Sequence, residues 1–324
     1  MIPDQKRDAV SAALRSAFGV AIEQLDEIRP LTEGMSSAHV FRIGVRGRAY
    51  ALRMVAYGDP TREYACMQAA AAAQIAPRVH YASVAERVAI IDFVEARPLP
   101  PDMLALLAPL VARLHALRPF PKVIEEIAAV EGFVQRVRAA GVELRAGDLH
   151  ADELFDRFAE LAAVYPRDAE LVASHDDLKP QNVLYDGRRL WLVDWEAAFL
   201  NDRFFDLAVA GNFFARDDAE HARFAALYLG RTPSDVERAR ALLVRVTCHV
   251  SYAALFALLA ARGGAPIDAA PAADFRAFHD GLISGAEDTR DAATKLRYAK
   301  VHLVEGLRLV RAARFRDALE RCRE

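Results

Sequence analysis

The sequence predicts an α+β protein with a small N-terminal antiparallel β lobe, which carries one inserted helix, and a larger, mainly helical C-terminal lobe. Short runs of β-branched and aromatic residues dominate residues 28–94. From residue 100 onward, apolar residues instead recur at spacings of three and four. The 324 residues, of which 53% are hydrophobic, supply enough apolar side chains for two cores. We therefore divide the chain into residues 1–95 and 96–324, with a linker near residues 95–101.

The N-terminal lobe is predicted to begin with a short amphipathic helix in residues 1–18. Five strand-like runs follow: EIRPL, HVFRIGV, AYALRMV, RVHYAS and RVAIIDFV. The turn sequence GDP at residues 58–60 opens a helix over residues 61–74. The third and fourth strands should therefore flank this helix.

The C-terminal lobe contains amphipathic helical patterns in MLALLAPLVARLHAL and ADELFDRFAELAAVY. Between these helices and the helical C-terminal third, residues 171–196 form a strand-rich island. The longest nearly uncharged run, residues 246–261, is 16 residues long and contains a histidine. It is short for a membrane span of about 20 residues, so we expect a buried core helix.

Charge and cysteine content exclude several classes of partner. The net charge of −3 comes from 42 basic and 45 acidic residues interleaved along the chain, a pattern that does not favour nucleic acid or an anionic membrane. The three cysteines have no metal-like spacing. The first residues lack a signal-peptide core, so we expect a cytoplasmic protein with a small-molecule partner.

The stretch SHDDLKPQNVLYDG, residues 174–187, contains the pattern H-x-D-x-x-x-x-N, formed by His175, Asp177 and Asn182 with Lys179 between them. Asp194 follows twelve residues after Asn182, at the end of the apolar run LWLV. Phosphoryl transfer requires a carboxylate that positions the attacking hydroxyl and oxygen ligands for Mg²⁺. This set of residues provides both.

We assign hydroxyl positioning to Asp177 and metal binding to Asn182 and Asp194. Lys179 is placed to meet the transferred phosphoryl group. Two structural alternatives stay open: an Asp-Asp pair before proline often forms only a turn, and an asparagine before a strand often forms only a cap. A similar stretch at Asp148, AGDLHADE, has glutamate where the asparagine should be, and we interpret it as a helix start.

The chain resembles the protein-kinase-like superfamily and, within it, the aminoglycoside phosphotransferase and choline kinase group, the phosphotransferase enzyme family. The resemblance covers nearly the whole chain and is greatest to bacterial choline and ethanolamine kinase-like proteins. It implies a two-lobed protein-kinase-like fold, with ATP and Mg²⁺ as cofactors and His175 as a support of the catalytic loop. It also implies these nucleotide contacts: a phosphate loop at Gly34, Ser36 and Ser37, an ion pair of Arg53 with Glu63, and an adenine hinge from Asp92 to Val94.

A protein substrate is not expected, because no glycine follows Asp194 and no A-P-E sequence appears. Instead, the segment after Asp194 resembles the choline and ethanolamine kinases, with Asn201, Arg203, Phe205 and Asp206 matching their N-x-R-x-F-D run. The resemblance implies that Asp206 braces the catalytic loop. Its structural alternative is the N-terminal cap of the helix that follows.

The acceptor is expected to be a small, cationic alcohol similar to choline, ethanolamine or thiamine. Trp195, Tyr252 and Phe256 are candidates for an aromatic cage, with Glu196 as the negative partner. Aromatic residues at helical spacing also suit a core. An aminoglycoside or amino-sugar acceptor is the alternative, and a nucleotide-binding pseudokinase is the alternative of another class. A homodimer, and GTP in place of ATP, stay open.

Overall fold

The computed structural model describes residues 2–31, 38–167 and 170–323. Contacts divide the chain into two compact units: unit 1 comprises Met1–Pro121 and His175–Phe199, and unit 2 comprises Lys122–Ser174 and Leu200–Glu324. By contacts, the catalytic-loop segment therefore groups with the N-terminal sheet. The predicted boundary between two lobes at residue 95 stays a prediction.

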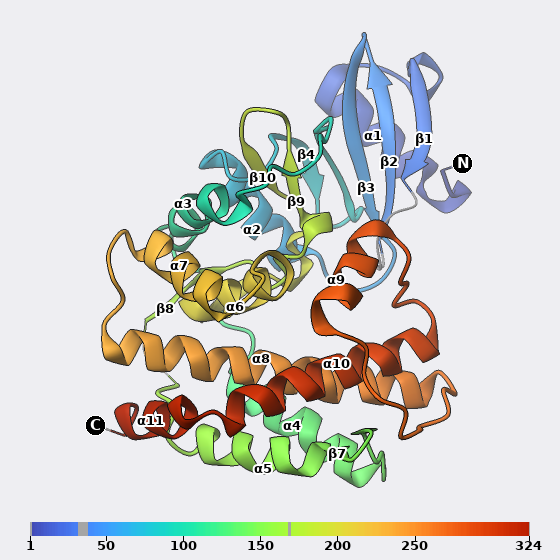
Figure 1. Ribbon diagram of the computed structural model, residues 1–324. Coiled ribbons are helices and arrows are strands. Elements are labelled where there is room, and N and C mark those ends of the chain that lie inside the picture. The colour runs from blue at the N-terminus through green and yellow to red at the C-terminus, as the bar shows by residue number, and fades with distance from the viewer. Residues whose placement is uncertain (1, 32–37, 168–169, 324) are drawn as a thin grey trace. The chain divides into compact units, whose positions relative to one another are not determined.

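Unit 1 contains a five-stranded antiparallel sheet in the order β1-β2-β3-β5-β4, as the strand patterns predicted (Figure 1). The strands are β1 (Glu27–Leu31), β2 (Ala38–Val45), β3 (Arg48–Val55), β4 (Val79–Ser83) and β5 (Val88–Asp92). Alternate residues of β3, such as Leu52 and Met54, are fully buried. Arg53 lies on this central strand, opposite Val40 of β2 and Ala89 of β5.

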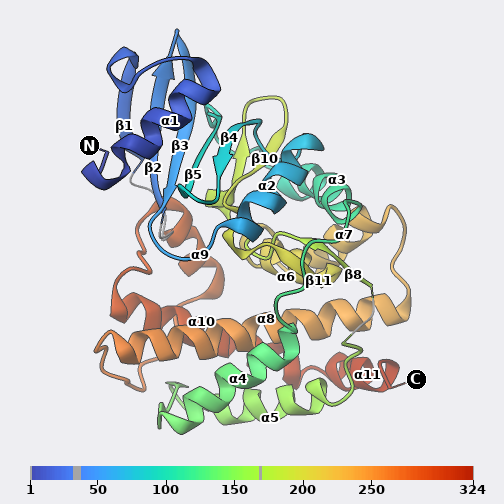
Figure 2. The same ribbon diagram turned by 180° about the vertical axis from the view of Figure 1, so that it is seen from behind.

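Helix α1 (Arg7–Phe18) covers the sheet, and Figure 2 shows it lying across the strands. Its Val10 and Leu14 join Ile43 and Leu52 in one buried core. Gly19 ends the helix with a φ of 69°, a left-handed conformation that glycine adopts without steric cost. The short helices η1 (Asp4–Lys6) and η2 (Ile22–Gln24) flank α1.

The inserted helix α2 (Thr61–Ala72) separates β3 from β4, as predicted. Asp59 opens it by accepting a 2.9 Å hydrogen bond from the Thr61 amide. Unit 1 also contains α3 (Met103–His115), the hairpin of β9 (Val183–Tyr185) and β10 (Leu190–Leu192), and the short helices η3 (Pro180–Asn182) and η4 (Trp195–Ala197). The Leu192 amide donates to the carbonyl of Ile75 at 2.9 Å, which joins the hairpin to the segment that follows α2.

Unit 2 is mainly helical, with α8 and α10 packed along each other in its centre. Its helices are α4 (Glu126–Ala139), α5 (Ala151–Ala162), α6 (Arg203–Phe214), α7 (Asp218–Leu229), α8 (Asp235–Arg262), α9 (Phe275–Ser284), α10 (Ala292–Arg311) and α11 (Ala313–Arg321). Two small two-stranded sheets pair β6 (Arg145–Ala146) with β7 (Leu149–His150), and β8 (Leu171–Ser174) with β11 (Phe199–Asp202). The stretch at Asp148 is thus the turn of a hairpin, and the helix begins at Ala151.

Helix α8 contains the uncharged run that the sequence assigned to a core helix. It is the one helix of the described residues long and apolar enough to cross a membrane by length and composition, yet 78% of its most apolar window is buried within the molecule. Such burial is typical of the central helix of a soluble fold. This burial agrees with the predicted core helix.

Unit 2 buries several histidines. His249 and His302 lie with their Nδ1 atoms 2.9 Å apart, both fully buried, and the His302 ring stacks on Tyr252. Burial lowers the pKa of both rings well below the ordinary value, and the Arg245 charge lowers that of His249 further. Burial also lowers the pKa of His279 to about 4. These rings are therefore neutral in the folded protein near pH 7.

We expect the free energy of unfolding to fall as the pH drops below about 6.5. The unfolded chain then binds protons that the folded chain excludes, at a cost of up to about 1.4 kcal/mol per histidine per pH unit. Urea titrations between pH 6.5 and 5.5 measure this slope. The double variant His249→Leu/His302→Phe should have a shallower slope. An equal slope in both proteins would refute the assignment.

Candidate active site

The predicted catalytic residues meet in unit 1. Lys179 Nζ lies 2.6 Å from Asp177 Oδ2, and Asn182 Nδ2 donates to the same oxygen and to the Asp177 carbonyl, each at 2.8 Å. The Asp177 carboxylate is thus held by two side chains. The amide nitrogen of Asn182 is engaged with Asp177, so the predicted metal contact would use its amide oxygen. Lys179 contacts the carboxylate here, and its contact with a phosphoryl group stays a prediction.

The β9-β10 hairpin brings Asp194 close to Asn182. Val183 pairs with Leu192, and the Val193 amide donates to the Asn182 carbonyl at 3.0 Å. The spacing of twelve residues is therefore the length of one hairpin. Asp194 has a φ of 66°, a left-handed conformation that is unusual outside glycine and that often occurs at functional sites.

His175 and Trp195 support the loop from inside unit 1. His175 Nε2 donates to the Val193 carbonyl at 3.0 Å, and its ring centroid lies 4.7 Å from that of Trp195. Trp195 is only 2% exposed and packs edge-on against Phe120. A tryptophan in this position cannot offer its face to an acceptor, so we correct its assignment from acceptor cage to loop support.

Arg53 is surrounded by three carboxylates. Its Nε donates to Glu63 Oε1 at 2.8 Å, as the sequence predicted, and its Nη2 lies 3.0 Å from Asp194 Oδ1. Glu196 Oε2 is 3.4 Å from the same nitrogen. Burial opposes the charge of Arg53, but the three carboxylates outweigh it and raise the pKa of the guanidinium. Arg53 therefore connects Asp194, the predicted metal ligand, to helix α2.

Burial also raises the pKa of Glu63, against the opposing effect of Arg53. Glu63 is 7% exposed, so its negative charge depends on the arginine beside it. The ion pair is thus part of the core of unit 1 rather than a surface contact.

Arg62 contacts the candidate site in a way that the sequence analysis missed. Its Nη2 donates to the Glu196 carbonyl at 2.7 Å, and its Nη1 donates to the Ala198 carbonyl. It thereby fastens helix α2 to the segment after Asp194. The only signal in the sequence was the charge of Arg62 beside Glu63. A charge alone does not reveal that the side chain binds backbone carbonyls more than 130 residues away.

The predicted hinge follows strand β5. His80 Nε2 lies 2.7 Å from Asp92 Oδ1, and the amides of Asp92 and Phe93 donate to the carbonyls of Arg78 and Ala49. The amides of Asp92 and Phe93 are therefore already engaged within the protein, and adenine binding at the hinge stays a prediction. The predicted phosphate loop at Gly34, Ser36 and Ser37 lies outside the described residues.

In unit 2, Asp202 rather than Asp206 caps helix α6. Asp202 accepts a 2.8 Å hydrogen bond from the Phe204 amide and also binds Tyr165 and Arg240. The alternative of Asp206 as the cap is therefore wrong, because the helix already begins at Arg203. Asp206 is fully buried in the first turn.

The remaining aromatic candidates lie on α8 in unit 2. The rings of Tyr252 and Phe256 stack with centroids 5.9 Å apart, and each contacts Tyr298 edge-on. Phe256 is buried, whereas Tyr252 is half-buried. Of the two, Tyr252 retains more surface for a ligand.

A family model described as the phosphotransferase enzyme family matches residues 27–242. The chain belongs to the phosphotransferase enzyme family. The matched range includes all five strands of the N-terminal sheet and every residue predicted to be catalytic or to bind metal. This membership confirms the predicted family and the prediction of a small-molecule kinase.

Solved structures similar to this phosphotransferase have the same fold. A choline/ethanolamine kinase family protein from Mesorhizobium loti is 21% identical, with a TM-score of 0.70 over 98% of this chain and 99% of that one. The choline kinase LicA from Streptococcus pneumoniae is 14% identical, with a TM-score of 0.60 over 93% and 98%. A spectinomycin phosphotransferase, solved with ADP and spectinomycin, is 12% identical, with a TM-score of 0.53 over 91% and 98%. No curated protein matches this sequence.

Proposed function

We propose that this phosphotransferase transfers a phosphoryl group from ATP to the hydroxyl of a small, cationic metabolite similar to choline, ethanolamine or thiamine. One observation carries the proposal. Asp177, ordered by Lys179 and Asn182, shares a unit with Asp194 and the Arg53 ion-pair cluster. This arrangement supplies the positioning and electrostatic groups on which phosphoryl transfer depends.

In the proposed reaction, the Asp177 carboxylate accepts a hydrogen bond from the acceptor hydroxyl and aims its oxygen at the γ-phosphorus of ATP. The carboxylate takes the hydroxyl proton as the new O–P bond forms and ADP departs. Its hydrogen bond from Asn182 and its contact with Lys179 restrict its rotation.

The residues present fit Mg²⁺. The described residues contain no group of three or more His, Cys, Asp or Glu side chains that could hold a metal ion. Nucleotide-bound Mg²⁺ needs only one or two protein oxygen ligands, because phosphates and water complete its shell. Asn182 and Asp194 would provide these ligands. When bound, Mg²⁺ neutralises negative charge on the phosphates.

Arg53, positioned by Glu63, is proposed to bind the nucleotide phosphates, with Gly34, Ser36 and Ser37 completing the phosphate loop. Adenine is proposed to bind at the hinge from Asp92 to Val94. The relatives solved with AMP and with ADP support a nucleotide site in this fold.

For the acceptor, we propose that Glu196 binds the cationic group. Its side chain is 42% exposed, and at 3.4 Å its carboxylate is the most distant of the three around Arg53. Tyr252 and Phe256 of unit 2 stay the proposed aromatic residues for the acceptor. Asp206 is proposed to brace the catalytic loop.

An aminoglycoside or amino-sugar acceptor is the second candidate, favoured by the spectinomycin phosphotransferase among the similar structures. We place the enzyme in the cytoplasm, with neither nucleic acid nor membrane as a partner.

ADP release with Mg²⁺ and ATP tests this function across choline, ethanolamine, thiamine, glucosamine and an aminoglycoside. Neutral 3,3-dimethyl-1-butanol, which has the shape of choline, is the matched control for charge. We expect a cationic alcohol to stimulate ADP release and the neutral one to be at least about tenfold poorer in kcat/KM. If nucleotide binds but no alcohol stimulates turnover, the chain is a pseudokinase.

A further inference from the structure

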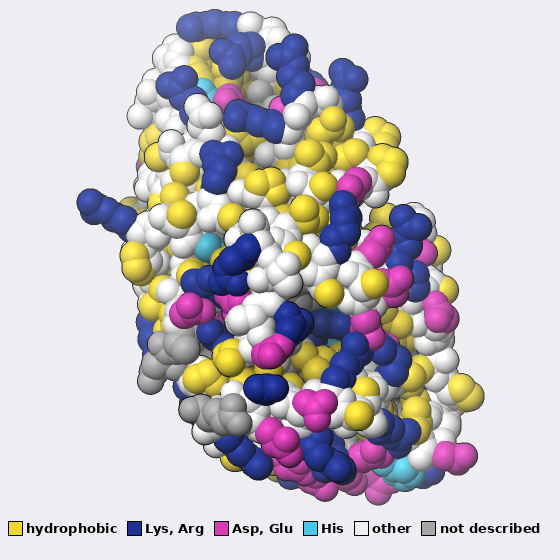
Figure 3. All heavy atoms as spheres, turned by 60° about the vertical axis from the view of Figure 1, so that its left-hand side comes forward, with side chains coloured by type: hydrophobic (Ala, Val, Ile, Leu, Met, Phe, Trp, Pro, Cys, Tyr) yellow, Lys and Arg dark blue, Asp and Glu magenta, His cyan; other side chains and the backbone are white. Residues whose placement is uncertain are grey.

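Unit 2 contains a cavity of about 700 Å³ whose lining includes none of the candidate active-site residues. Helices α6, α7, α8 and α11 surround it. On the face shown in Figure 3, hydrophobic side chains occupy a hollow that is bordered by charged ones. The volume lies within the range of small-molecule sites, about 300–1,000 Å³.

The walls of the cavity are mainly apolar. Phe204, Leu207 and Ala208 of α6 line it together with Ala226 of α7 and Leu242 of α8. Such a surface gains free energy when it covers the apolar part of a ligand. The polar contribution comes mainly from charged side chains, five arginines and four carboxylates.

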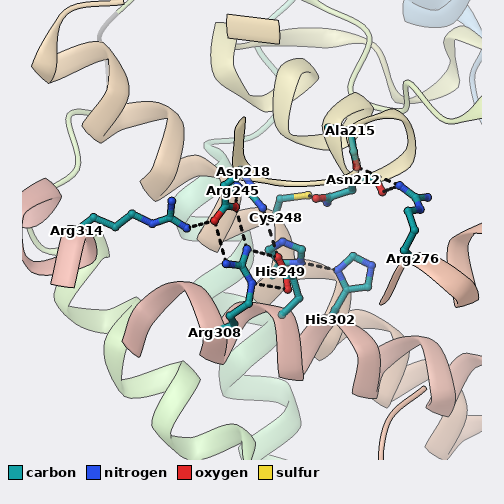
Figure 4. A network of polar contacts seen from close by, with 11 residues as sticks. Asn212, Ala215, Asp218, Arg245, Cys248, His249, Arg276, His302, Arg308 and Arg314 are labelled. Carbon is teal, nitrogen blue, oxygen red and sulfur yellow. Dashed lines mark hydrogen bonds and ion pairs between the residues drawn. The ribbon is translucent and has the colours of Figure 1, made fainter. Parts of the chain in front are cut away.

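Three arginines converge on Asp218, a residue of the cavity lining (Figure 4). Arg245 and Arg308 donate to Asp218 at 2.8 and 2.9 Å, and Arg314 donates to its other oxygen. Arg245, Arg314 and Asp218 all line the cavity. Each comes from a different helix, so the packing of α7, α8 and α11 fixes this part of the lining.

The cluster carries one positive charge in excess. Glu305 is the second carboxylate, in contact with Arg245 and Arg308, so two carboxylates face three guanidinium groups. His221 adds no charge near pH 7, because burial lowers its pKa well below the ordinary value. Burial likewise lowers the pKa of Arg245, which is 8% exposed and only partly compensated by Asp218. An added anion would complete the compensation of this buried arginine.

We propose that this cavity binds a small amphiphile with one carboxylate, its apolar body against Phe204, Leu207 and Leu242 and its carboxylate at Arg245 and Arg314. The apolar walls select the body of the ligand, and the excess guanidinium charge selects its anionic end. A cationic amphiphile would meet like charge there. The proposal does not depend on the reaction, because binding is measured without turnover.

Calorimetric titration with octanoate tests the proposal, with octylamine and 1-octanol as probes of the same chain length. We expect saturable binding of octanoate, at least about tenfold weaker binding of 1-octanol, and no binding of octylamine. Equal binding of octylamine, or no saturable binding of octanoate, would overturn the proposal.

Two pairs of variants locate the site. Ala226→Phe fills the cavity and should abolish octanoate binding, whereas Ala219→Phe, on the same helix but outside the lining, should not. Arg314→Gln should weaken octanoate binding about tenfold. Arg311→Gln is its control, since Arg311 is similarly exposed but binds Glu153. If the cavity variants bind octanoate as the controls do, the ligand lies elsewhere and the proposal fails.

Discussion

Asp177→Asn is expected to lower kcat by about 10²- to 10⁴-fold while leaving nucleotide affinity nearly unchanged. Asparagine has nearly the same shape and retains an oxygen that can accept the bond from Asn182, but it can neither take a proton nor pair with the Lys179 ammonium. Steady-state ADP release with the best acceptor measures kcat, and calorimetric titration with Mg²⁺ and ATP measures nucleotide affinity.

Asp148→Asn is the matched control. Its sequence context resembles the catalytic loop, yet it lies in the β6-β7 hairpin of unit 2. We expect its kcat to equal that of the unmodified protein. If Asp177→Asn retains full turnover, Asp177 is not the residue that positions the hydroxyl.

Arg53→Leu is expected to destabilise unit 1 by about 3 kcal/mol and to abolish turnover. The substitution leaves Glu63, Asp194 and Glu196 near one another without their common cation. Urea unfolding at pH 8 measures the loss of stability. Because protonated carboxylates no longer repel, the loss relative to the unmodified protein should shrink at pH 5.

Arg53→Lys separates stability from nucleotide binding. Lysine restores the charge but not the planar fork that contacts two carboxylates at once. We therefore expect most of the stability to return while kcat/KM for ATP stays low. A lysine variant with full activity would contradict the role proposed for the guanidinium. A leucine variant as stable as the unmodified protein would contradict the ion-pair account.

The β lobe was predictable because its signals are local. Alternating apolar residues in β2 and β3 and the turn before Thr61 fix where the strands and the helix begin. Arg53 lies on a strand and Glu63 on the first turn of the helix that follows it. Because the two elements are consecutive in the chain, a contact between the two residues could be expected. The spacing between Asn182 and Asp194 was equally informative, because it equals the length of a β-hairpin.

Other features depend on tertiary packing, which the sequence does not display. Trp195 seemed suited to a cation cage, but the loop turns it inward against Phe120 and His175. The left-handed backbone at Asp194 and the backbone contacts of Arg62 likewise arise from segments distant in the chain. Asp202 displaced Asp206 as the helix cap because β11 delivers the chain into α6 four residues earlier than the motif indicated.

Mass spectrometry of the acceptor after incubation with the enzyme, Mg²⁺ and ATP tests the central claim most directly. The account predicts that a small cationic alcohol gains one phosphoryl group on its hydroxyl, in amounts equal to the ADP released, and that Asp177→Asn abolishes this product. ADP formation with no phosphorylated alcohol, or equal product from Asp177→Asn, would contradict it.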